Sequence, residues 1–527
     1  MTRFNIIGST PVRSRLAAAG LLLLASVIAP AAPGRRVPEE RTLSLTLRQC
    51  LDTALRENLA LSIERLNPAM DALALKEVRE RYLPQFELTY QNGDTNTPGT
   101  WGVEGSDIAS SFDSVNLGLV QSFPWGTSLS LGVSSAMTDT TRSFSLINPS
   151  YFSSVRLDVR QPLLRGFGSK AANVEGIKAA RAVEMADASV RAAAAQTAFE
   201  VEAAYWNLVL ARENLKVQES SLASSRQILD RNREAARIGT ESGIGVLNAE
   251  TEVARYEDAV LAASRAVQSQ EDLLRKLLRL PAGGEAGIIP LDRPEIEIRE
   301  VSAADVLRAA LANRPEMDIA RRRIDNSRSD VDYFRNQSLP KVDLNFSFWS
   351  PGISGVRYVY QDDNPLSGVV IGRIAGGRGE SFSDILKGKY PNWSVTLTLE
   401  VPIASFLSRT GLARARAAGE QNELRLEKEK SDIEFEVQDV IRELEAKARM
   451  IASSARYREL TEKRVASETQ RYQQGLVGSE WLFNYRRELA NAKSAEIQAV
   501  IEYKIALARL DRITGASPAA GGERNPS

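Results

Sequence analysis

The sequence contains two copies of one arrangement, and this duplication restricts the possible folds more than any other feature. The segment "ALRENLAL" at 54–61 matches "ALANRPEM" at 310–317, and Leu83-Pro84 matches Leu339-Pro340 at the same offset of 256. Further along, the offset is 236 for four ordered pairs: Phe199 with Phe435, Val201 with Val437, Gly239 with Gly475, and Asn248 with Asn484. Because these matches keep one order, they predict a duplicated structural unit rather than chance similarity.

Each copy predicts the same series of elements. The first repeat, 32–290, is expected to hold a helix at 46–82, a β region at 85–161, and long helices at 171–238 and 244–280. The second repeat, 291–515, is expected to hold a helix at 302–338, a β region at 341–402, and long helices at 411–473 and 479–513. Thr46 with Gln49 predicts a capping box, and Ser302 with Asp305 a close variant of it. A flexible tail is expected at 516–527.

The long helices carry a seven-residue apolar repeat that predicts coiled-coil packing. No proline occurs from Ala171 to Ile238, so at ~1.5 Å per residue this helix could reach about 100 Å. The apolar positions seven residues apart are Val201, Leu208, Leu215, Leu222 and Leu229; Val246, Val253, Val260, Val267 and Leu274; and Val437, Leu444 and Ile451. These positions are expected to hold helix against helix and to bind nothing by themselves.

The β regions alternate strictly between apolar and polar residues, which predicts half-buried strands. In "YLPQFELTY", Phe86, Leu88 and Tyr90 alternate with Gln85, Glu87 and Thr89. An ordinary antiparallel sheet on a helical layer would alternate in the same way. A membrane β-barrel is favoured because the polar faces carry charge and aromatic residues cluster near the strand ends. One copy offers too few strands to close a wide lumen, so such a barrel requires several chains.

The composition argues against an enzyme. The 527 residues include no histidine and one cysteine, Cys50, which removes the commonest general base and metal ligand. Lysine plus arginine and aspartate plus glutamate balance at 67 each, so no charge excess indicates nucleic acid. "RGFGSK" at 165–170 lacks the spacing of a phosphate loop and is expected to be a strand-to-helix turn. We therefore predict no cofactor, no metal site and no catalytic residue.

The N-terminus has the layout of a secretory signal peptide. Arg3, Arg13 and Arg15 precede a short apolar run, and Ala29-Pro30-Ala31 is a plausible cleavage site. The alternative is a membrane anchor, but the apolar run is shorter than the ~20 residues that a spanning helix requires. Residues 1–31 are therefore expected to direct export. Cys50 lies well downstream of this site, so we expect it to be a small buried helix residue rather than a lipid attachment site.

Over essentially the whole mature chain, the sequence resembles the TolC-type outer-membrane efflux proteins. The resemblance rests on "LTLRQCLDTALREN", both Leu-Pro switches, "QPLLRGFG", "AYWNLVLARENL", "RIGTESGIGVLNAETEV" and "RYQQGLVGSEWLFNYRREL". It implies an α+β membrane protein: a homotrimer whose outer-membrane β-barrel, in contact with lipid, continues into a long periplasmic α-helical coiled-coil barrel. It also implies a passive exit channel of a tripartite efflux or type I secretion system. Such a channel docks to a periplasmic adaptor (membrane fusion) protein and to an inner-membrane pump or secretion ATPase.

The resemblance also implies where the gate lies. The two hairpin turns would form the periplasmic tip, and the candidate adaptor contacts are Gly239, Thr240, Gly243, Gly475, Leu476, Val477, Gly478 and Ser479. Tyr472 stands where the family tends to have a gate tyrosine. Where some members have aspartates lining the constriction, this chain has Trp481 and Asn484, with Glu480 the nearest acid. The alternative for Tyr472 and Trp481 is packing between neighbouring helices.

The number of strands departs from the family pattern of two per copy. The first copy has four alternating segments and the second has two. The extra pair, around 117–133, either widens the barrel or projects from it as a hairpin, and we expect the projection because it keeps the two copies equivalent. The competing function is an exported structural coiled-coil protein with inserted sheets and no transport role; the duplication favours a channel wall instead.

Overall fold

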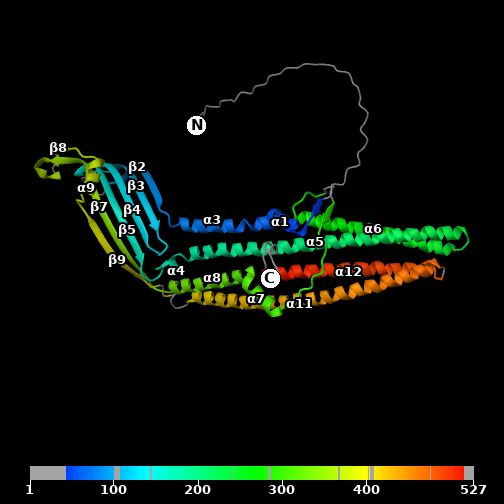
Figure 1. Ribbon diagram of the computed structural model, residues 1–527. Helices are drawn as coiled ribbons and strands as arrows, with labels where there is room; N and C mark the ends of the chain where they lie inside the picture. The colour runs from blue at the N-terminus through cyan, green and yellow to red at the C-terminus, as the bar shows by residue number, and fades with distance from the viewer. Residues whose placement is uncertain are drawn as a thin grey trace, which may run out of the picture.

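The computed structural model is long and narrow, with a β-sheet at one end and the tips of two helical hairpins at the other (Figure 1). It describes residues 43–99, 107–142, 145–240, 242–282, 287–365, 368–401, 403, 409–474 and 476–515. The expected signal peptide at 1–31, the expected tail at 516–527 and the candidate tip residue Gly475 lie outside these residues.

The helix expected at 46–82 is three helices: α1 (Leu47–Glu57), α2 (Leu59–Glu64) and α3 (Asn67–Glu80). The predicted capping box of Thr46 and Gln49 is present. The single-helix prediction is wrong because Asn58 has an extended backbone, with ψ of 127°. Its side chain caps α2 by accepting from the Leu61 amide and donates to the Leu277 carbonyl at 3.0 Å. Asparagine competes well for such local bonds, so it interrupts the helix.

The second copy breaks at the matching position. The helix expected at 302–338 is α7 (Ala303–Asn313) and α8 (Pro315–Gln337), separated by Arg314 with ψ of 129°. A residue before proline is pushed out of helical geometry, which explains the break. Arg314 lies 256 residues after Asn58, so both copies turn at one place by different chemistry. The cap predicted for Ser302 is wrong in detail, because its side chain makes no capping bond.

The long helices have equal lengths in the two copies. After the short α4 (Ser169–Ala172), α5 (Val174–Arg237) has 64 residues, as does α11 (Thr410–Gln473). Their partners α6 (Gly243–Leu277) and α12 (Ser479–Ile513) have 35 residues each. Most of the predicted apolar positions are buried: Val201, Leu208, Leu229, Val253, Val267, Leu274, Val437, Leu444 and Ile451.

In the portions of the chain that the structure describes, no helix carries an apolar stretch long enough to cross a membrane.

The main sheet contains six long antiparallel strands in the order in which the chain forms them. They are β2 (Gln85–Pro98), β3 (Asp107–Ser122), β4 (Ser128–Thr140), β5 (Ile147–Pro162), β7 (Lys341–Tyr360) and β9 (Asn392–Glu400). Short β8 (Val370–Ile374) pairs with the far end of β7. The expectation that the extra pair projects from the sheet is wrong, because β3 and β4 pair along their lengths with β2 and β5.

The register separates two faces of this sheet. Phe86 lies opposite Leu119, Leu119 opposite Leu131, and Leu131 opposite Leu157, so one face carries continuous apolar rows. The other face carries polar residues, including Arg156, Asp158 and Arg160. Beyond the apolar rows, helix α9 (Arg378–Leu386) covers a patch of small residues, where the hydroxyls of Ser381 and Ser153 lie 2.8 Å apart.

Helices continue the sheet as a second section of the same wall (Figure 1). The neighbours in this layer are α3 and α5, α5 and α8, and α8 and α11. The strands joined to these helices stand in the same order: β2, β5, β7 and β9. The predicted glycine turn at 165–170 forms the β5-to-α4 junction, where Gly166 and Gly168 have φ of 83° and 86°.

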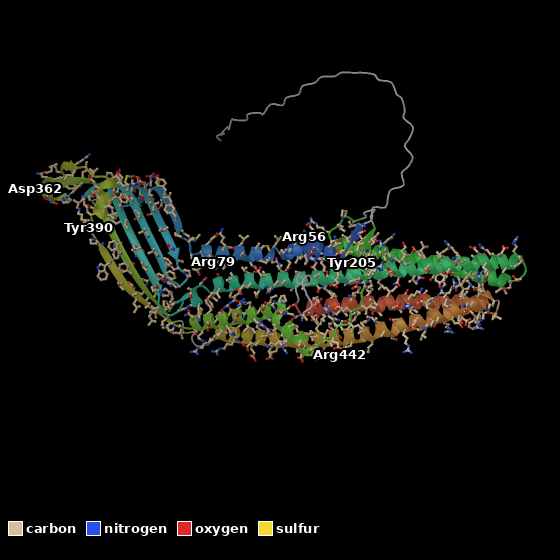
Figure 2. All side chains as sticks on the ribbon, viewed as in Figure 1. Arg56, Arg79, Tyr205, Asp362, Tyr390 and Arg442 are labelled. Carbon is tan, nitrogen blue, oxygen red and sulfur yellow. The ribbon has the colours of Figure 1, made fainter. Side chains whose placement is uncertain are left out.

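A small parallel sheet lies beside the helices at the middle of the helical section. Parallel strands β1 (Leu43–Leu45) and β6 (Ile288–Pro290) pair there, and the hydroxyl of buried Tyr205 donates to Asp292 Oδ2 at 2.8 Å (Figure 2). Cys50, fully buried as expected, belongs to the same apolar core. Burial raises the pKa of its thiol to about 12, so this cysteine is a packing residue.

Candidate gate at the helical tips

The two helical hairpins end in short turns at the end of the molecule away from the sheet (Figure 1). Gly239 has φ of 82°, a backbone conformation that favours glycine, and the Ser242 side chain caps α6 by accepting from the Gly245 amide. Ile238 and Leu476 are exposed on the two turns. Most of the candidate adaptor contacts are exposed as well, namely Thr240, Gly243, Leu476 and Gly478. Ser479 is buried.

Just behind the turns, one buried side chain connects all four long helices. Asn232 of α5 is only 1 % exposed. Its Nδ2 donates to the Gly245 carbonyl of α6 at 3.1 Å and to Ser479 Oγ of α12 at 3.0 Å. The Tyr472 hydroxyl of α11 donates to its Oδ1 at 2.6 Å. We call these four residues the tip clasp; buried polar groups satisfied in this way fix how helices pack.

Further contacts between the hairpins surround the tip clasp. Arg487 Nη2 of α12 lies 3.0 Å from Glu252 Oε1 of α6 and forms a partly buried ion pair. The Arg231 guanidinium lies 5.9 Å from the centre of the Tyr472 ring. An apolar cluster beside the tip clasp also spans the two hairpins, and Tyr472 packs against it; its buried members are Ile228, Leu229, Ala249, Val253, Leu482 and Phe483. The hairpins are therefore held together near their turns by both polar and apolar contacts.

Comparison with known proteins decides the family. The model of the outer membrane efflux protein family matches residues 106–278 and 306–516. The chain belongs to the outer membrane efflux protein family. The two matched segments fall one in each sequence repeat. No curated protein matches the chain by sequence.

Solved structures of outer-membrane channels have the fold of this efflux protein. The OprN channel has a TM-score of 0.63 at 16 % identity, and the match covers 89 % of each chain. VceC of Vibrio cholerae has a TM-score of 0.62 at 14 % identity, covering 89 % of this chain and 96 % of VceC. MtrE of Neisseria gonorrhoeae, solved in an open state, has a TM-score of 0.59 at 17 % identity and covers 91 % of this chain and 93 % of MtrE. At these identities the likeness establishes the fold.

The other candidate gate residues of the efflux protein lie in the first turns of α12. Trp481 is 58 % exposed and stacks on Tyr485, with ring centres 6.4 Å apart. Asn484 accepts a hydrogen bond from Arg487 at 3.0 Å, and Glu480 is exposed. Tyr472 is therefore bonded to the neighbouring hairpin, and Trp481 lies on the surface of the single chain.

Sequence reasoning missed Asn232, Glu252 and Arg487. A signal for Asn232 was available: it follows Leu229 by three residues, which is a core position of the same heptad pattern. A polar asparagine at such a position typically sets helix register at some cost in stability. Glu252 and Arg487 gave no comparable signal, because charged residues are frequent along both helices.

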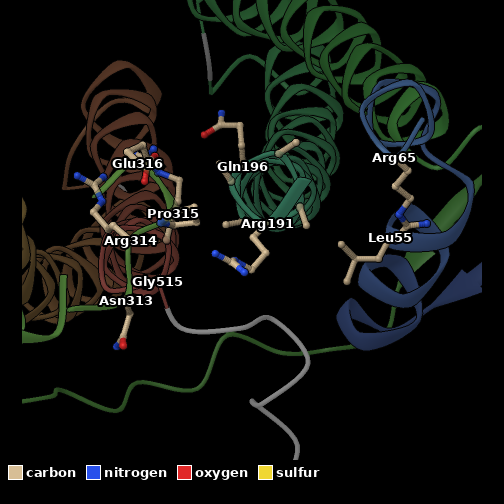
Figure 3. A pocket seen from close by; sticks show the side chains of 14 residues that line it. Leu55, Arg65, Arg191, Gln196, Asn313, Arg314, Pro315, Glu316 and Gly515 are labelled. Carbon is tan, nitrogen blue, oxygen red and sulfur yellow. The ribbon is translucent and has the colours of Figure 1, made fainter. Parts of the chain in front are cut away.

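A cavity of about 490 Å³ lies at mid-length among α1, α2, α5, α7, α8 and α12 (Figure 3). Its lining includes Arg65, Arg191, Arg314 and Arg512. Arg191 pairs with Asp318 at 2.8 Å, and Arg314 and Arg512 both pair with Glu436. Three of these guanidinium groups therefore already form ion pairs within the chain, as is typical of packing between helices.

Members of the efflux family are transport channels rather than enzymes.

Proposed function

We propose that this chain is one third of a passive exit channel that crosses the outer membrane and extends into the periplasm. The observation that carries the proposal is that the sheet and the helical layer end on the same two edges. Among the described strands of the sheet, β2 and β9 each pair with one neighbour, and α3 and α11 continue those edges. A sheet in a bilayer cannot leave its edges open, so the edges of adjacent copies must pair.

An exposed apolar line along α2 and the start of α3 supports this closure. Leu59, Ile63, Leu66, Met70 and Leu73 follow the four-and-three spacing of a helix seam and are all exposed. The opposite edge helix, α11, also exposes apolar residues, among them Leu424 and Phe435. Three copies, as the family resemblance implies, would bury these residues against one another and form a homotrimer.

The tip clasp supports a gate at the periplasmic end. If α11 and α12 swing away from α5 and α6, Tyr472 and Arg487 lose their partners on the other hairpin, while the helices themselves stay intact. The turns would bind a periplasmic adaptor through their exposed residues Ile238, Thr240 and Leu476. The adaptor would connect the channel to an inner-membrane pump. The channel itself supplies no energy.

Fractionation followed by electrophoresis without heating tests the proposal. We expect an outer-membrane band of trimer size that dissociates to the single chain on heating. A monomeric species in the soluble periplasmic fraction would exclude the channel and would favour the structural coiled-coil alternative.

A further inference from the structure

The strand hairpin formed by β3 and β4 is part of the wall. β3 pairs with β2 from Asp107 to Val120 and with β4 from Ser110 to Ser122. β4 in turn pairs with β5 from Ser128 to Thr138. These ladders run the full height of the apolar rows, so the hairpin separates β2 from β5 throughout.

The turn between β3 and β4 is hydrogen-bonded to the junction between β5 and α4. The turn, 123–127, is closed by the Phe123 amide donating to the Thr127 carbonyl at 2.8 Å. The Gly168 amide donates to the Trp125 carbonyl at 3.1 Å, which ties the turn to the β5-to-α4 junction. Gly126 packs so closely that a Cβ there would lie 2.4 Å from the Gly166 carbonyl oxygen. Such contacts hold the hairpin in line with the other strands.

The six strands match the width of the helical section beneath them. Strands ~4.8 Å apart and tilted by about 40° occupy ~6 Å of circumference each, so six strands span about 38 Å. Four helices at ~8–10 Å spacing, α3, α5, α8 and α11, span about 32–40 Å. Four strands would span only about 25 Å, and the barrel would have to be narrower than the helical tube.

We propose that three copies close an 18-stranded barrel, so that the duct keeps a wide bore through the outer membrane and admits cargo of polypeptide width. The inference rests on the proposed channel function. With side chains occupying ~5 Å of the wall, 18 strands leave a bore of about 25 Å, against about 15 Å for 12 strands. A single helix is ~10–12 Å wide, so the wider bore passes a helical hairpin and the narrower one does not.

The side chains that the hairpin turns toward the polar face agree with a wide bore. Along the middle of the hairpin they are small and uncharged: Ser114, Asn116, Gly118, Ser130, Gly132 and Ser134. Val120 and Phe112 lie on the same face nearer the two ends of β3, and the Phe112 ring lies against Gly93 of β2. The charged residues of this face lie on neighbouring strands, where Arg160 pairs with Asp343 at 2.7 Å and Arg156 with Asp158 at 2.8 Å. The middle of the hairpin therefore adds circumference without a bulky side chain on the lumen face.

Thiol labelling on intact cells tests the proposal with two adjacent residues of β3. Asn116→Cys faces the lumen and Leu117→Cys faces lipid, while the wild-type chain, with Cys50 buried, is the blank. Polymer-linked maleimides of graded width are added from outside. We expect Asn116→Cys to react with reagents up to about 20 Å wide, and Leu117→Cys to remain unlabelled. Three results would overturn the proposal. Both residues could be labelled, Asn116→Cys could react only with reagents narrower than about 15 Å, or Asn116→Cys could remain unlabelled.

Asn345→Cys and Phe346→Cys on β7 separate this result from a failure of the proposed function. These residues lie on the polar and apolar faces of a strand whose place in the wall does not depend on the hairpin. Labelling of Phe346→Cys would mean that the sheet is not in a membrane, and the channel itself would be excluded. A density map of the unmodified trimer in lipid nanodiscs counts the strands directly: 18 support the wide barrel and 12 overturn it.

Discussion

The hydroxyl of Tyr472 donates to the side-chain oxygen of Asn232 at 2.6 Å, and this bond joins the two helical hairpins of the chain next to their turns. The two residues lie 240 positions apart. Their bond does not stabilise either hairpin internally. It reports, and helps to set, the angle between the hairpins, which is the quantity that a gate at the tip must change.

We expect Tyr472→Phe to increase leakage through the channel. Loss of the bond leaves Asn232 Oδ1 without this donor in a buried site, which costs about 1–2 kcal/mol and favours the separated hairpins about tenfold. Single-channel conductance in planar bilayers measures the open fraction. Tyr457→Phe is the matched control, because that hydroxyl bonds Glu488 within one hairpin on an exposed surface. Equal leakage from both variants would contradict the role of the tip clasp.

The Arg487–Glu252 pair predicts a coupling between the same two hairpins. Glu252→Gln and Arg487→Gln are each expected to increase leakage, and the exchanged variant Glu252→Arg with Arg487→Glu to restore much of the closed state. A partly buried pair of this kind couples by about 1 kcal/mol. A double-mutant cycle on conductance gives the value. Additive effects of the two single changes would show that the pair does not hold the hairpins together.

The apolar line along α2 and α3 predicts the behaviour of the oligomer. Met70→Glu places a charge in the middle of the seam and is expected to abolish the heat-dissociable trimer, since burying an unpaired carboxylate costs several kcal/mol. Ala72→Glu adds the same charge to an exposed position of the same helix outside the seam. It should leave the trimer intact. Retention of the trimer in Met70→Glu would place the interface elsewhere.

Glu202 predicts a pH dependence of stability. Desolvation raises the pKa of its carboxyl from 4.5 to about 7; Asp511 also raises it, whereas the Trp206 hydrogen bond and Lys504 lower it. Because the folded chain holds this proton more tightly than the unfolded chain, the contribution of this carboxyl to stability is fully present below about pH 4.5 and is lost as the pH rises to about 7, by up to about 3 kcal/mol.

Thermal unfolding from pH 4.5 to 8 measures this effect. Glu202→Gln should remove this part of the slope and unfold at a higher temperature than the wild type at pH 8. Identical slopes for the two chains would rule out the carboxyl as the source.

The close packing of α9 on the sheet depends on the absence of a side chain at Gly352. A Cβ at this position would lie 2.0 Å from the Ser381 carbonyl oxygen, so Gly352→Val must displace the helix. We expect trypsin to cleave the α9 region about tenfold faster. Gly132→Val is the control, because a Cβ there meets no atom within 4 Å. Equal cleavage rates would show that α9 is held by other contacts, such as the ion pair of Arg378 and Asp113.

The periodicity of the sequence predicts the helices and strands well, but it does not predict which strands lie next to one another in the sheet. Seven-residue spacing identified Val201, Leu208 and Leu444 as buried because a helix seam repeats with its own geometry. Period two assigned Phe86 and Leu88 to one face of a strand, but it contains no information on which strand lies alongside. The position of β3 and β4 within the sheet therefore could not be predicted from alternation.

The tip clasp shows a second limit. Tyr472 was selected through the family resemblance, but its partner is on the other repeat, and a hydrogen bond between repeats leaves no pattern in either one. Asn232 could be noticed only as a polar residue in an apolar heptad position. The breaks at Asn58 and Arg314 were missed for a related reason, because capping and proline effects act on single residues and do not disturb the average helical pattern.

The antiparallel order of the sheet has a consequence for how such ducts change size in evolution. β2 and β9 run in opposite directions, so copies can join edge to edge in the antiparallel sense. Losing or gaining one strand would make the joining edges parallel. Whole hairpins such as β3–β4 are therefore the unit of insertion, and in a threefold assembly each insertion adds six strands at once. Bore width in this design would change by discrete jumps, and intermediate diameters would not occur.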